Sequence, residues 1–130
     1  MAKEFAIAKR DLPTSVRPTP TSSEVWRALE RIRNSSSMGR SERLNHLLTF
    51  LVETTLRGDA QYLKETTVGV AVFGRSPDYD PKTDTIVRSQ AWRLRAKLQD
   101  YYNAEGARDP IIISVPKGQY AAQFAFRDQT

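Results

Sequence analysis

The segment between Asp84 and Ala104 constrains the fold most, because it predicts one long helix with two chemically different sides. At 100° per residue its apolar side chains collect on one side, at Val87, Ala91, Leu94, Leu98 and Tyr101. The opposite side and its edges are polar and basic, with Ser89, Trp92, Arg93, Ala96 and Lys97. Arg88 and Arg95 fall together on a flank. The chain therefore needs a core for one side of this helix and leaves a basic side outward.

Two further helices are predicted upstream. Thr21 and Glu24 form a capping-box pattern ahead of an apolar stripe, which predicts a helix over about 22–33. After the loop at 35–40, Ser41 is a candidate cap for a second helix. That helix carries a leucine stripe and ends near Arg57 and Gly58; the stripe is Leu44, Leu47, Leu48 and Leu51.

The segments around the long helix are less uniform. Residues 62–75 have valines typical of a strand and a capping-type start typical of a helix, and periodicity alone leaves both open. Residues 76–84 form a loop with two prolines and three aspartates, in which Asp84 or Thr83 is expected to cap the long helix. Two apolar stretches, 111–115 and 119–126, flank Pro116, Lys117 and Gly118, which predicts a β-hairpin with Lys117 at its tip.

Composition narrows the class of protein. The 130 residues suit one domain, with a basic, proline-containing flexible tail at 1–20 and a short tail at 127–130. A net charge of +5 favours a polyanionic partner such as nucleic acid or an anionic membrane surface. No cysteine is present, which excludes disulfides and thiolate metal sites. No apolar run approaches the length of a membrane span, so we expect a cytoplasmic protein.

Catalytic chemistry finds little support in the sequence. The only histidine, His46, lies in the leucine-rich helix and is expected at its surface or at the edge of the core. The stretch 78–84 resembles part of a calcium loop, but Thr83 and Ser89 stand where such a loop needs glycine and glutamate. No phosphate-binding glycine loop is present either. We therefore expect no enzyme, no metal and no cofactor.

The order of elements, with a basic third helix before a hairpin, is typical of a winged helix-turn-helix. The stretch "AWRLRAKLQDYY…DPIIISVPKGQYAAQF" resembles the end of the OmpR/PhoB-type winged-helix DNA-binding domain. Leu94, Arg95, Lys97 and Leu98 match its recognition-helix motif. Ile113, Val115, Gly118 and Tyr120 follow its wing, although Gln119 replaces the usual glycine.

The run "LKE…VGV.VFGR.PDYDP.TD.IVR…RLR.KL..YY" resembles more closely a winged-helix domain found near the N-terminus of larger bacterial proteins with tetratricopeptide, propeller or cyclase modules. The OmpR/PhoB-type resemblance covers about residues 41–126, and it implies that "YLKETTVGVAVFG" contains a short positioning helix. It implies an α+β winged helix-turn-helix over 21–126, with a core of three helices and a wing at 41–126 and an additional helix at 22–33. That additional helix is expected to cover the domain or to mediate a homodimer.

The resemblance further implies a regulator of transcription that binds double-stranded DNA, with the helix at about 84–104 in the major groove. The candidate contacts are Arg40, Arg43, Arg88, Ser89, Gln90, Trp92, Arg93, Lys97, Lys117 and Gln119. Arg93 would contact guanine, Gln90 adenine and Lys117 phosphate. Arg88 and Arg95 are expected to pair with Asp80, Asp84 or Glu65, or to touch phosphate. Trp92 suits DNA contact and packing under the first helix equally.

A core is expected from the apolar positions of these elements: Leu44, Leu47, Leu48, Leu51, Val68, Val72, Phe73, Val87, Leu94, Leu98, Ile112 and Tyr120. The main alternative function is a protein-interaction module whose basic helix docks an acidic partner. RNA binding is less favoured, because no aromatic sheet platform is evident.

Overall fold

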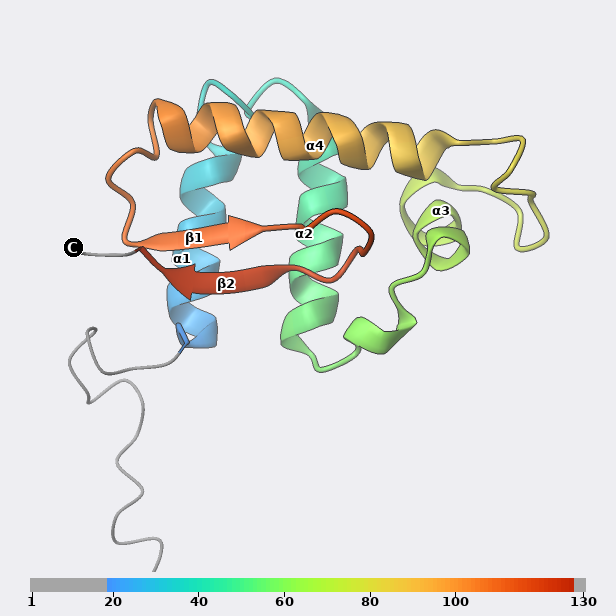
Figure 1. Cartoon of the computed structure of the whole chain (residues 1–130), viewed down its shortest axis with the longest axis horizontal. Helices are drawn as coiled ribbons and strands as arrows, with labels where there is room; N and C mark the ends of the chain where they lie inside the picture. The colour runs from blue at the N-terminus through green and yellow to red at the C-terminus, as the bar shows by residue number, and fades with distance from the viewer. Residues whose placement is uncertain (1–18, 128–130) are drawn as a thin grey trace, which may run out of the picture.

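The computed structural model describes residues 19–127 (Figure 1). This part of the chain has an α+β fold with four α-helices, one short 3₁₀ turn and a two-stranded antiparallel sheet. The predicted tails at 1–20 and 127–130 lie almost entirely outside the described residues. In chain order the elements are α1 Ser22–Arg33, α2 Glu42–Leu56, η4 Ala60–Tyr62, α3 Glu65–Phe73, α4 Ile86–Asn103, β1 Ile111–Ser114 and β2 Gln123–Phe126.

The long helix α4 lies across one end of α1 and α2, and the β1–β2 hairpin lies beside α4 in front of α1 (Figure 1). α1 packs against β1, α2 packs against α4, and α3 packs against the first part of α4. Both apolar sides predicted for α2 and α4 therefore face the interior of the same domain. The helix α4 also contacts β1, so it packs against α2, α3 and the first strand of the hairpin.

Local signals explain the helix boundaries. The Thr21 hydroxyl accepts a hydrogen bond from the Glu24 amide at 3.2 Å, and the Glu24 carboxylate accepts one from the Thr21 amide at 2.8 Å. This confirms the predicted capping box. The Ser41 hydroxyl likewise accepts from the Leu44 amide at 3.2 Å and begins α2. At the start of α4 the cap position is Thr85, whose side chain caps nothing, and the Asp84 carboxylate instead accepts from the Ile86 amide at 3.2 Å.

Residues 65–73 form a helix and not a strand. Gly69 is buried on the side of α3 against which the Tyr79 ring packs, and the Tyr79 hydroxyl donates to the Glu65 carbonyl at 3.0 Å. A Cβ on Gly69 would lie 2.2 Å from that hydroxyl oxygen, so the glycine is required for close approach. Gly74 ends α3 in the left-handed conformation, at φ 65°. Tertiary packing therefore decided an element that periodicity left open.

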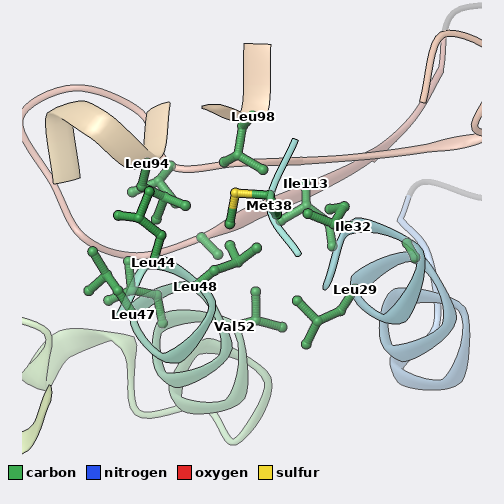
Figure 2. Close-up of a cluster of buried hydrophobic side chains, with 14 of the residues drawn as sticks. Leu29, Ile32, Met38, Leu44, Leu47, Leu48, Val52, Leu94, Leu98 and Ile113 are labelled. Atoms are coloured by element: carbon green, nitrogen blue, oxygen red, sulfur yellow. The ribbon is translucent and has the colours of Figure 1, made fainter. Parts of the chain in front are cut away.

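The core is built from all layers (Figure 2). Most predicted core residues are buried, but Val72, Phe73 and Tyr120 are only partly buried. Ile112 was predicted in the core and is half-buried, because the alternation of the strand turns Ile111 and Ile113 inward instead. The helix α1 is part of this core, with Val25, Leu29 and Ile32 fully buried.

The loop between α1 and α2 also contributes to the core, which the sequence pattern did not indicate. Met38 is fully buried and lies between Ile32, Leu98 and Ile113 in Figure 2. Ser35, which is buried, donates from its hydroxyl to the Ile32 carbonyl at 2.6 Å and accepts from the Met38 amide at 3.2 Å. These bonds satisfy the polar groups of the loop, so an irregular segment can be buried.

The hairpin forms, but its second strand begins later than predicted. Ser114 pairs with Gln123, so residues 115–122 make an eight-residue connection in place of a tight turn. Pro116 has no amide hydrogen to donate to a ladder. The carbonyls of Val115 and Gln119 accept hydrogen bonds from the Arg95 side chain of α4. The residues on either side of Lys117 are therefore used for tertiary contacts and not for strand pairing.

Candidate nucleic-acid interface

The polar side of α4 is solvent-exposed as a continuous surface. We call the exposed residues Ser89, Trp92, Arg93, Ala96 and Lys97 the outer face. Trp92 is 68% exposed and does not pack under α1, one of the two placements left open for it. Tryptophan is enriched at interfaces, because its ring is apolar and its indole N–H can donate a hydrogen bond.

The cations of the outer face are not neutralised within the described residues. Arg93 and Lys97 are exposed and make no hydrogen bond or ion pair with any part of residues 19–127. Asp100 is also exposed and, at 100° per residue, falls on the same side one turn after Lys97. The two turns from Ser89 to Lys97 are therefore the basic part of this face.

A neighbouring flank of α4 has the opposite character. Arg88, Arg95 and Tyr102 follow one another at intervals of seven residues and so lie along one line of the helix. We call these three residues the docking flank, because each one bonds to a different neighbouring segment. The Arg88 Nε lies 3.1 Å from the Glu65 Oε2 on α3, and its Nη2 donates to the Pro81 carbonyl at 2.8 Å.

The outcome for the two flank arginines differs. Pairing of Arg88 with Glu65 was among the predicted partners and is confirmed. Pairing of Arg95 with a carboxylate was wrong, since its guanidinium donates to three carbonyls of the β1–β2 connection: Val115 at 2.7 Å, Pro116 at 3.2 Å and Gln119 at 3.0 Å. The planar guanidinium carries five N–H donors in a fixed arrangement, which suits donation to several carbonyls at once.

Tyr102 completes the flank at the edge of β1. Its hydroxyl accepts from the Ile113 amide at 2.7 Å, on the edge that β2 does not cover. Burial raises the pKa of Tyr102 to about 12, so the hydroxyl stays protonated over the physiological range. Tyr102 was not among the predicted site residues, although its spacing of seven from Arg95 places it on the same line of the helix.

The remaining α4 candidates take intermediate positions. Gln90 is half-buried at the margin between the outer face and the core, so it is less accessible than predicted. Ser89 is exposed, and its hydroxyl donates to the Ile86 carbonyl of its own helix at 3.2 Å. Arg88 is exposed but already paired with Glu65. Among the predicted contacts on α4, three are exposed and have no bonded partner within residues 19–127: Trp92, Arg93 and Lys97.

The hairpin places Lys117 beside α4. Lys117 is exposed, has no partner in residues 19–127, and lines a hollow of about 270 Å³ with Arg95, Leu98 and Gln99 of α4. Gly118 next to it has φ 84°, a left-handed conformation that favours glycine at this tip. Gln119 is exposed, but its carbonyl is taken by Arg95 and its side-chain amide faces the Ala121 carbonyl at 3.5 Å.

Two more predicted cations lie near the start of α2. Arg43 lines a hollow of about 310 Å³ with residues from the end of α3 and with Ile86 at the start of α4. Arg40 is exposed in the loop just before α2. Neither arginine has a bonded partner in the described part of the chain. His46 is exposed and lines the same hollow as Arg43, as its predicted surface position implies.

The acidic loop before α4 serves the structure. Arg75 Nε lies 2.6 Å from the Asp84 Oδ2, and this hydrogen bond holds the pKa of the Asp84 carboxyl below its ordinary value. Asp80 accepts from the Lys82 amide at 3.0 Å through its side chain. Residues 19–127 contain no group of three or more His, Asp or Glu side chains placed to hold a metal ion. They also contain no helix long and apolar enough to cross a membrane.

Comparisons with known proteins add no relative to this picture. No family model, no curated protein and no solved structure matches the chain.

Proposed function

We propose that this protein is a winged helix-turn-helix that binds double-stranded DNA and regulates transcription. In this assignment α2, α3 and α4 are the three core helices, α4 is the helix that enters the major groove, and the hairpin is the wing. The α+β fold with a hairpin directly after its longest helix is compatible with that architecture.

One observation carries the proposal: the charges of α4 are divided between two sides. Arg88 and Arg95 on the docking flank are bonded to neighbouring segments, whereas Arg93 and Lys97 on the outer face have no partner in the described chain. An exposed helix face with unneutralised cations has a positive potential that attracts phosphates. A helix of this diameter fits the major groove.

The outer face supplies the chemistry for reading bases. Arg93 can donate two hydrogen bonds to the O6 and N7 of guanine, and Trp92 offers an apolar contact for a thymine methyl group. Lys97 and Lys117 suit phosphate oxygens on either side of the groove. Arg40 and Arg43 near the N-terminus of α2 suit a further stretch of backbone. Gln90, the proposed adenine contact, requires a small outward movement from its half-buried position.

A homodimer stays part of the proposal, because paired wings would define the spacing of two half-sites. The apolar stripe of α1 is used inside the monomer, at Val25, Leu29 and Ile32. A dimer through α1 would therefore use its other side, where Trp26 is 36% exposed.

The test is a DNA-binding titration of the full chain at several salt concentrations, after selection from random genomic fragments. Arg93→Ala is expected to reduce the preference for selected over bulk fragments, by about tenfold for a lost bidentate base contact. Lys97→Ala should weaken selected and bulk DNA equally and lower the slope of log K against log salt by about 0.9. Arg27→Ala is the matched control, because Arg27 is an exposed cation on α1 with no bonded partner among residues 19–127.

The same titration separates the main alternative, a surface that docks an acidic protein. Trp and Arg are the residue types most enriched at the centres of protein interfaces, so Trp92 beside Arg93 gives this alternative a specific basis. Feeble, unselective DNA binding that Arg93→Ala, Lys97→Ala and Arg27→Ala change equally would overturn the DNA proposal and favour a protein partner.

A further inference from the structure

The guanidinium of Arg95 donates hydrogen bonds to the β1–β2 connection on both sides of Lys117. Its Nε donates to the Val115 carbonyl at 2.7 Å, and its Nη2 donates to the carbonyls of Pro116 at 3.2 Å and Gln119 at 3.0 Å. The three acceptors bracket Lys117 and Gly118, the tip of the hairpin. An eight-residue connection without strand pairing is thus attached to α4 through one side chain.

Arg95 is well suited to hold this connection rigidly. It is half-buried, so its hydrogen bonds compete less with water than those of an exposed arginine. Hydrogen bonds from a charged donor are stronger than neutral ones, and the planar fork fixes the direction of each donor. Tyr102, seven residues later, holds the Ile113 amide of β1 in the same manner, so α4 contacts both the strand and its tip.

We propose that Arg95 is a positioning residue: it makes the hairpin tip a rigid extension of α4 and thereby sets where Lys117 meets the DNA backbone. The second half of this inference rests on the proposed function. In this proposal Arg95 acts on DNA only through the connection, because its Nε and Nη2 donors are bonded to the carbonyls of Val115, Pro116 and Gln119. The wing and the helix would then meet the duplex as one surface, without the entropy loss of ordering a free loop on binding.

The first experiment needs no DNA. Backbone ¹⁵N order parameters at Lys117 and Gly118 are measured in the wild type, Arg95→Ala, Arg95→Lys and Lys117→Ala. A rigid backbone gives about 0.85 and a flexible one below about 0.6. We expect the rigid value in the wild type and in Lys117→Ala, and the flexible one in both Arg95 variants. Arg95→Lys keeps the charge but lacks the fork, and the amide spectrum of the rest of the chain reports that each variant is folded.

The second experiment is the salt dependence of DNA binding in a double-mutant cycle. Lys117→Ala should lower the slope of log K against log salt by about 0.9, the loss of one phosphate contact. Arg95→Lys should lower it similarly although the charge is kept, and the double variant should lose no more than either one. Additive losses would mean that Arg95 contacts phosphate independently, which overturns the inference.

The outcomes separate the two proposals. Unchanged order parameters in both Arg95 variants would overturn the positioning role, whatever the DNA result. Suppose that Lys117 and Gly118 become flexible in those variants but the wild type binds no DNA. This result would overturn the proposed function, while the role of Arg95 in holding the connection rigid would remain.

Discussion

Replacing Leu29 in α1 tests whether this helix belongs to the folding unit. Leu29 is fully buried and lies near Ile32 and Val52 in Figure 2. Truncating a buried leucine to alanine typically destabilises a protein by about 2–5 kcal/mol, through lost burial and the cavity that remains. We take about 3 kcal/mol for Leu29→Ala. With an unfolding entropy of about 2.1 cal/mol/K per residue over the roughly 110 residues of 19–127, this corresponds to a fall in Tm of about 13 °C.

The assay is reversible thermal or urea unfolding followed by circular dichroism. Leu48→Ala in α2 is the positive comparison, because Leu48 is equally buried. Arg27→Ala is the negative one, since Arg27 is exposed on α1 and should change stability by less than about 0.5 kcal/mol. If Leu29→Ala lost less than about 1 kcal/mol while Leu48→Ala lost about 3, α1 would be an appendage outside the cooperative core, and the packing argument would be refuted.

Three further outcomes are expected. Stability should fall as the pH rises from about 10 through 12, because the unfolded chain releases tyrosine protons near pH 10 while burial raises the pKa of Tyr102 to about 12 in the folded chain. Burial also raises the pKa of Tyr79, Tyr101 and Tyr120, so Tyr102→Phe should reduce this fall in pH-dependent urea unfolding without abolishing it. Replacing thymine by deoxyuridine in a selected site should weaken wild-type binding about fourfold, the worth of one buried methyl group, and should not affect Trp92→Ala; an equal effect on both proteins would exclude the methyl contact. Asp100→Asn should tighten DNA binding about twofold at low salt, since it removes a negative charge from the outer face, and an affinity that is unchanged or weaker would contradict the placement of that face on DNA.

The helix boundaries were the part of this protein that local sequence determined. The capping pair of Thr21 and Glu24, the Ser41 cap and the leucine stripe of α2 are signals within a few residues of one another, and all appear in the structure. The division of α4 into an apolar and a basic side follows from helix geometry alone. The same periodicity identified Arg93 and Lys97 as outward-facing, and both are exposed.

Contacts between distant segments were decided only by the tertiary structure. Periodicity could not choose between helix and strand for 65–73, where Tyr79 of the following loop packs on Gly69. It also gave no sign that Met38, in an irregular loop, enters the core, since no repeat marks a single buried residue.

The arginines of α4 show the same limit in their chemistry. Arg93 and Arg95 look alike in the sequence. Arg93 has no bonded partner within residues 19–127, whereas Arg95 donates to three carbonyls of a connection that lies 20 to 24 residues further along the chain. Helix geometry fixes the direction in which a side chain leaves the helix, and only the fold decides what stands in that direction to bond with it.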